Sequence, residues 1–199
     1  KIRQYCDEHQ IQFLAGDSVA LACDGKLADD DVAVRFHRAL GKLPPSLWAA
    51  HVPKSSLGPD GKGDAIGPFG SVFFSNLCRS SWLVKKEVGE SDEVVNVGIF
   101  PQKQNDGMRQ KPVGFELTFS PERIDVRGTN LAHVEGLSER LPLAARMVEA
   151  LKAGPATYVS LAEALGAKID SVIQAARRSD KFEKVIAADG ITRIVLRSK

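Results

Sequence analysis

The sequence predicts an α/β fold: a mixed sheet with its helices, followed by a small helical domain that ends in a hairpin. Apolar runs at residues 11–21 and 47–52 flank a segment with helical periodicity, and the order strand, helix, strand is typical of a parallel unit. Four shorter strand-like runs follow between residues 79 and 126, which indicates a meander that extends the sheet. After residue 141 the pattern changes to three short helices and a hairpin, so we predict a second domain.

The first segments predict a parallel crossover unit. Residues 1–10 are expected to form the end of a helix that leads into the first strand. Residues 29–31 are all aspartate, which suits a helix N-terminus because negative charge there offsets the helix dipole. Val32, Phe36 and Leu40 then recur every fourth residue and predict one buried stripe.

The middle of the chain predicts a loop, a helix and the meander. Residues 53–70 are rich in Gly, Pro and Asp, and a loop of this length in a compact domain is usually functional or disordered. The stretch SVFFSNL, residues 71–77, predicts a short helix. The predicted meander strands span residues 79–86, 94–100, 113–119 and 123–126. Joined to the parallel unit, they would form one mixed sheet.

The last part of the chain predicts a winged helix-turn-helix domain. We interpret residues 128–141 as a linker between a core at 1–127 and this domain at 142–199. A first amphipathic helix is stopped by Gly154-Pro155, and the stretches TYVSLAEALGA and IDSVIQAARRSDKF predict two more. A hairpin turning at Asp189-Gly190 completes the pattern.

The charge distribution points to the C-terminal part. The chain has 199 residues, 43% hydrophobic and 26% charged, with a formal net charge of +2, so the chain as a whole makes no argument for nucleic acid. Residues 140–199 hold 11 Lys and Arg against 6 Asp and Glu, whereas the rest holds 16 against 19. A basic domain on a mildly acidic body hints at a nucleic-acid surface near the C-terminus.

The cysteines and the hydropathy favour a cytoplasmic protein. Cys6, Cys23 and Cys78 lack metal-ligand spacing, and an odd number without a signal peptide suggests reduced thiols. No apolar run has the length that a membrane span needs, so no membrane partner is expected.

The glycine-rich phosphate loop of ATPases does not occur in the sequence. Its pattern needs a Gly five residues before a Gly-Lys pair and a hydroxyl residue after it. Gly25-Lys26 is preceded at that spacing by Ala20, and Gly61-Lys62 by Ser56; neither pair is followed by Ser or Thr. Because the chain also starts with Lys1, we expect a fragment that begins partway through a domain.

Four stretches in order resemble one family. FLAGDS, LWAAHVPK, PFGSVFFSNLCRSSWLVKK and FPQKQNDG…PVGFEL are similar to the second half of RecA-like AAA-type ATPases of plasmids and phages, the replicative helicase kind. The resemblance covers residues 1–127 and implies a partial RecA-like P-loop NTPase core. It further implies that the full-length protein uses ATP and Mg²⁺, forms a hexameric ring and acts on DNA as a helicase or replication ATPase.

The resemblance implies a nucleotide site at the ends of the first two strands. Asp17 matches the second nucleotide motif, in which a carboxylate at a strand end holds magnesium, and Ser18 would assist. His51 matches a polar sensor that hydrogen-bonds the γ-phosphate. An ordinary strand-end turn and a satisfied strand-end histidine are the structural alternatives.

Two further cations match interface positions of the hexameric relatives. Arg79 matches the arginine that stabilises charge on a neighbouring subunit's transferring phosphate. Lys103 matches a second nucleotide-contacting position, although Asn105 stands where family members often have Arg. A strand-edge salt bridge and an exposed loop lysine are the alternatives for Arg79 and Lys103.

DNA contacts are expected from two places. The loop at 55–69 matches the position of the DNA-contacting loop, with Lys54 beside it and Lys62 within it. In the terminal domain the third helix and the wing would offer the remaining basic side chains, which are Lys168, Arg177, Arg178, Lys181 and Arg193. Many winged helices bind proteins instead.

Other functions stay open. Gly16-Asp17-Ser18 also resembles the nucleophile block of GDSL-type esterases, but the Asp-x-x-His that they need is matched only by Asn130 and His133, without the carboxylate. A recombination or regulatory ATPase of the RecA/KaiC-like kind is one alternative. A non-catalytic winged-helix DNA-binding regulator is another.

Overall fold

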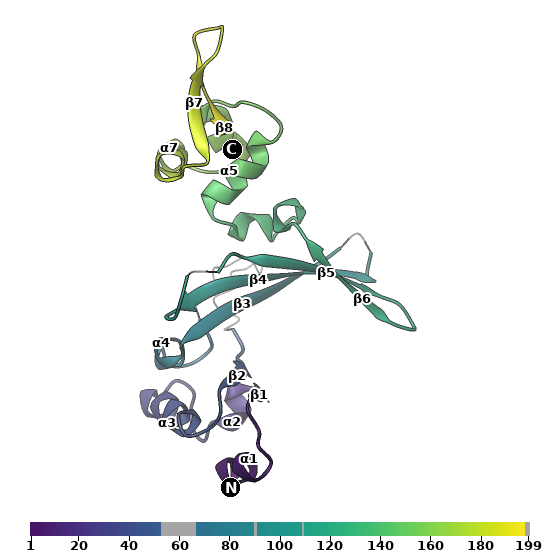
Figure 1. Cartoon of the computed structure of the whole chain (residues 1–199), viewed down its shortest axis with the longest axis vertical. Helices are drawn as coiled ribbons and strands as arrows, with labels where there is room; N and C mark the ends of the chain where they lie inside the picture. The colour runs from purple at the N-terminus through teal and green to yellow at the C-terminus, as the bar shows by residue number, and fades with distance from the viewer. Residues whose placement is uncertain (53–66, 90, 109, 198–199) are drawn as a thin grey trace. The chain divides into compact units, whose positions relative to one another are not determined.

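The computed structural model describes residues 1–52, 67–89, 91–108 and 110–197 (Figure 1). It has a mixed α/β fold, with seven α-helices and small parallel and antiparallel sheets in the described residues. The chain divides into two compact units, residues 1–83 with 101–110, and residues 84–100 with 111–199. No helix of the described residues has the length and apolar character that crossing a membrane requires.

The first unit contains the predicted parallel pair. Its elements in chain order are α1 (Ile2–Glu8), β1 (Leu14–Asp17), α2 (Val19–Ala22), α3 (Asp30–Leu40), β2 (Ser46–Ala49) and α4 (Phe73–Leu77). Strand β1 pairs with β2 in parallel, which confirms the strand–helix–strand unit. The first strand is shorter than predicted, because the chain enters α2 directly after Ser18.

A small core lies on one side of this pair. Val32, Ala33 and Phe74 are buried there, and the ring of Trp48 packs beside them. Gly16 permits this packing, because a Cβ at that position would lie 2.2 Å from the Trp48 ring. Alternate residues point to opposite faces of a strand, and Ala15, Asp17, Leu47 and Ala49 on the other face are exposed.

The meander forms a four-stranded sheet in the predicted order. Its strands are β3 (Ser80–Val88), β4 (Val94–Gln104), β5 (Val113–Phe119) and β6 (Ile124–Thr129), and β5 is antiparallel to both neighbours (Figure 1). The prediction of one mixed sheet is wrong, since β1 and β2 pair only with each other in the described residues. Short loops let each meander strand pair with the next strand in the sequence at little entropic cost. The meander therefore forms without pairing to β1 or β2 in the described residues.

The two faces of the meander differ. On one face, Leu131 lies close to Gly98 and Gly114. The opposite face is continuously apolar, and its residues on β4, β5 and β6 are partly or largely exposed: Val95, Val97, Ile99, Val113, Phe115, Leu117, Phe119, Ile124 and Val126. The most exposed large side chain among these is Val126 at 60%.

The segment predicted as a linker has structure of its own. It contains two short 3₁₀ turns, η2 (Leu131–His133) and η3 (Ser138–Arg140). Leu131 and Leu137 are buried, the latter completely. We call residues 130–140 the connector.

The residues after the connector, 142–197, form the C-terminal module. Its elements are α5 (Leu143–Leu151), α6 (Tyr158–Ala164), α7 (Ile169–Arg178), β7 (Phe182–Ile186) and β8 (Thr192–Leu196). The strands pair antiparallel, so the three helices and the hairpin lie where they were predicted (Figure 1). Its core is formed by Met147, Leu151, Leu161, Ala162, Val172, Phe182 and Ile194.

Candidate functional site

The ends of β1 and β2 place two candidate residues at one edge. The parallel register sets Asp17 opposite Ala49, and His51 follows two residues later. The carboxyl ends of parallel strands share an edge, which is where open α/β sheets bind ligands. The pair therefore brings Asp17 and His51 to a common edge, as predicted. Both residues are exposed.

Ser18 is situated differently from Asp17. It is buried, with 4% of its surface exposed, and it precedes α2, where its carbonyl accepts hydrogen bonds from the amides of Leu21 and Ala22. Its hydroxyl is therefore poorly placed to attack a ligand from solvent. His133, the other residue of the esterase alternative, is bonded to Glu149 through Nε2 at 2.6 Å. These contacts disfavour esterase chemistry.

The described residues at this edge provide few ligands for a metal ion. No group of three or more His, Cys, Asp or Glu side chains in the described residues could enclose an ion. Asp17 provides a single exposed carboxylate, without an ion pair to another described residue. Magnesium is commonly held by one or two carboxylates together with water and substrate phosphates. Within the described residues, this edge therefore offers a metal ion a single carboxylate.

Arg79 lies immediately before β3, and its side chain is largely exposed. Its Nη1 is 3.5 Å from a carboxylate oxygen of Asp106, and 81% of the Arg79 side chain is exposed. Exposed ion pairs of this kind contribute little stability, so the side chain is not fixed. The strand-edge salt bridge, the structural alternative for Arg79, exists, but it leaves the guanidinium accessible.

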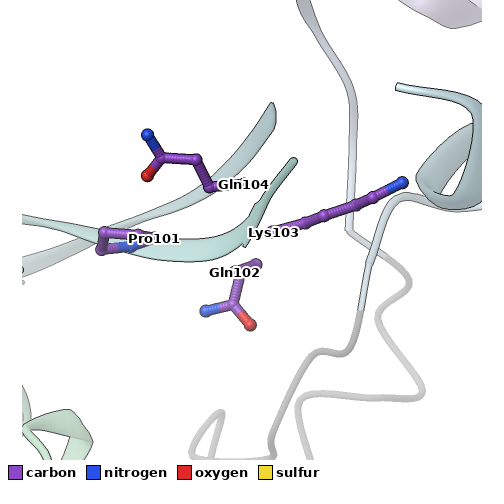
Figure 2. A pocket seen from close by; sticks show the side chains of 4 residues that line it. All are labelled: Pro101, Gln102, Lys103 and Gln104. Carbon is purple, nitrogen blue, oxygen red and sulfur yellow. The ribbon is translucent and has the colours of Figure 1, made fainter. Parts of the chain in front are cut away.

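Lys103 is held more firmly than a loop lysine. It lies on β4, and its Nζ donates hydrogen bonds to the carbonyls of Ser75 at 3.2 Å and Asn76 at 2.7 Å. These carbonyls belong to the last turn of α4, where a cation also offsets the helix dipole. Figure 2 shows the Lys103 side chain extended away from its neighbours at a pocket of about 310 Å³ lined by residues 101–104. To reach a nucleotide, the ammonium would have to leave both carbonyls.

His37 was not singled out from the sequence. Its ring lies near the rings of both Phe36 and Phe74, and Nε2 has no hydrogen-bond partner among the described residues. Burial is the main cause that lowers the pKa of His37, and the charge of Lys103 lowers it further, although a hydrogen bond with the Phe74 backbone opposes them. The sequence did contain a signal for this partial burial. His37 lies four residues after the buried Ala33, so both side chains lie on the same face of α3.

The basic residues of the C-terminal module fall into two groups. Four of them are exposed and form no ion pair with a described residue: Lys168, Arg177, Arg178 and Lys181. Arg193 on β8 instead binds Asp189 with both terminal nitrogens, and the Nη1 to Oδ1 distance is 3.2 Å. This contact is the largest cause that lowers the pKa of Asp189, followed by the hydrogen bond from the Ile191 amide. Lys54 and Lys62 lie outside the described residues.

Comparison with known protein families, curated proteins and solved structures finds no match for this chain.

Proposed function

We propose that the chain is the C-terminal part of a RecA-like ATPase of the plasmid and phage replicative helicase kind, with a winged helix appended. The complete protein would hydrolyse ATP between adjacent subunits of a hexameric ring and act on DNA. The parallel pair is the observation that carries this proposal. Asp17 and His51 follow neighbouring strands at one carboxyl edge, the place where such sheets bind nucleotides.

The open surfaces of both sheets support a larger core. Parallel sheets occur almost only with both faces covered, and a pair of strands is too small to be stable alone. Here one face of the β1–β2 pair is exposed, and so is the apolar face of β4–β6. ATP binding also needs a phosphate loop, whose pattern does not occur in the 199 residues. Under this proposal, the loop and further strands belong to residues outside this sequence.

Asp17 and His51 have distinct roles in the proposal. The Asp17 carboxylate would hold Mg²⁺, which supplies positive charge that neutralises phosphate oxygens. The His51 imidazole would hydrogen-bond a terminal phosphate, and its backbone carbonyl accepts a 2.7 Å hydrogen bond from the Phe69 amide. That bond ties the segment after β2 to the start of the α4 region. Ser18, being buried, would steady the turn after Asp17.

Arg79 would act on the nucleotide of a neighbouring subunit. Its accessible guanidinium and weak ion pair with Asp106 allow it to reorient towards a partner. A planar guanidinium with several fixed donors suits the spread charge of a transferring phosphate.

Mutation of Asp17 in the complete protein tests the proposed function. Asp17→Asn should leave the fold intact and reduce magnesium-dependent ATP turnover to background, because the metal loses a negatively charged ligand. Asp24→Asn is the matched control, since Asp24 is also exposed and its carboxylate has no partner among the described residues. Wild-type turnover in Asp17→Asn would remove this residue from the site.

A non-catalytic DNA-binding regulator is the second candidate. It is favoured by the C-terminal module, which combines a core of its own with four unpaired exposed cations in the described chain. A complete protein that binds duplex DNA but neither binds nor hydrolyses ATP would decide for this candidate.

A further inference from the structure

The connector is anchored to the sheet at its start. The Leu131 side chain lies over two glycines, and a Cβ on Gly114 would come within 2.7 Å of Leu131 Cδ2. Leu137 is completely buried further along. Gly136 lies close to Glu87 of β3, since a Cβ there would be 2.6 Å from Glu87 Oε1. A segment seated in this way is not a free linker.

The same connector is bonded to the C-terminal module through one carboxylate. Glu149 on α5 accepts hydrogen bonds from three side chains: His133 Nε2 at 2.6 Å, Lys152 Nζ at 2.7 Å and Asn130. The side-chain oxygen of Asn130 meanwhile accepts from the Ala132 amide at 3.1 Å, which fixes the start of η2. His133 and Asn130 belong to the connector, whereas Lys152 follows α5 itself. Two of the three donors therefore bridge the connector and the module.

We propose that Glu149 is a latch that holds the C-terminal module to the connector, so that the module and the β4–β6 sheet move as one body. The inference rests on these contacts alone and holds whatever the chain's enzymatic role. It differs from the arrangement expected of a module on a flexible linker, which would tumble independently. A nucleic-acid surface on the module would then keep a fixed orientation to the sheet.

The latch depends on the ionised carboxylate. Its hydrogen bonds, first from Lys152 and then from His133, lower the pKa of Glu149 from 4.5 to about 2. A group whose pKa is lowered on folding stabilises the structure above its unfolded pKa and loses that effect as the pH falls. The latch should therefore be closed above pH 4.5 and open progressively towards pH 2.

Backbone dynamics of the full 199-residue chain test the latch. We expect ¹⁵N relaxation to give the amides of α5–α7 and of β4–β6 one common correlation time in the wild type. Glu149→Gln should give the module a shorter correlation time than the sheet, and amide exchange in residues 130–140 should rise about tenfold or more. Glu163→Gln is the matched control, because Glu163 is an exposed glutamate of α6 whose carboxylate has no partner in the described chain.

Two further variants distinguish the contact of Glu149 with the connector from its contact with Lys152. His133→Ala removes a bridging donor from a side chain that is 65% exposed, so folding of the module is not at risk. It should uncouple the module as Glu149→Gln does, whereas Lys152→Met should leave the coupling in place. Independent tumbling in the wild type would overturn the proposal, and so would unchanged dynamics in both Glu149→Gln and His133→Ala.

Discussion

The C-terminal module and the parallel pair differ in how they bury their apolar side chains. The module encloses its own core: Met147 and Val172 are completely buried, and Leu161 and Ile194 nearly so. The pair of β1 and β2 has a small buried cluster beside Trp48 on one face and leaves Leu47 on the other face 53% exposed. The module therefore encloses a core of its own, whereas the parallel pair leaves apolar surface exposed on one face in the described residues.

Helix capping varies within the module as well as between the two regions. In the module, Thr157 caps α6 by accepting from the Ser160 amide, and the Ser160 side chain bonds back to the Thr157 amide. Helices α1, α2, α3 and α4 of the first unit have no side-chain cap of this kind. A helix without caps depends more on tertiary packing for its stability. Helices α5 and α7 of the module also have no side-chain cap, so capping alone does not separate the module from the first unit.

The largest contrast is expected from core truncation. Met147→Ala should destabilise the module by about 2–5 kcal/mol, because it leaves a cavity in an enclosed core. Val126→Ala, on the open apolar face of the meander, should change the free energy of unfolding by no more than about 0.5 kcal/mol. The free energies follow from hydrogen exchange of the most protected amides in each region. Equal losses would mean that the apolar face is covered in solution.

A smaller effect is expected where the connector meets the sheet. Gly114→Ala should destabilise the sheet by about 1–3 kcal/mol, since the new methyl group would lie 2.7 Å from both Leu131 Cδ2 and the Thr129 carbonyl oxygen. Gly128→Ala, on the neighbouring strand β6, has nothing within 4 Å of the added Cβ and should be nearly neutral. Urea unfolding of both variants measures the difference. A neutral Gly114→Ala would show that Leu131 is not seated against the sheet.

The smallest effect concerns DNA binding by the module. Arg178 is exposed and unpaired in the described chain, so Arg178→Ala should lower the slope of log K against log salt by about 1 for duplex DNA. Arg193→Ala should change the slope less, because Asp189 already neutralises Arg193. Fluorescence anisotropy at several salt concentrations gives both slopes. A larger change for Arg193→Ala would reverse the assignment of the two groups.

The sequence predicted the regular elements well where the pattern was strong. Strand β5 spans the predicted residues 113–119, and the hairpin turns at Gly190, whose φ of 75° suits glycine. Helix α3 begins among the predicted aspartates, with Asp29 as its N-cap. These signals are local, because each one depends on residues within a single element or turn.

The misses depend on contacts between distant residues. The apolar run after Ser18 was interpreted as strand, but Val19 packs with Val32 and Phe74 as part of a short helix. A local pattern cannot distinguish a short buried helix from a strand. Residues 128–141 were interpreted as a linker, and the burial of Leu131 and Leu137 within them is recognisable only once the sheet is known. Glu149 was missed for the same reason, since its bridging donors are 16 or more residues away.

The most direct test of the proposed nucleotide site is a mixture of two inactive subunits of the complete protein. Arg79→Ala alone should reduce turnover by about 10³-fold or more, with little change in nucleotide affinity. An arginine that acts on a neighbouring subunit's transferring phosphate stabilises mainly the transition state. A subunit with Arg79→Ala keeps its Asp17, and a subunit with Asp17→Asn keeps its Arg79. Mixed rings should therefore regain activity where an intact Asp17 faces an intact Arg79 of the neighbour. Mixtures that stay inactive, although native mass spectrometry shows mixed rings, would contradict a site shared between subunits.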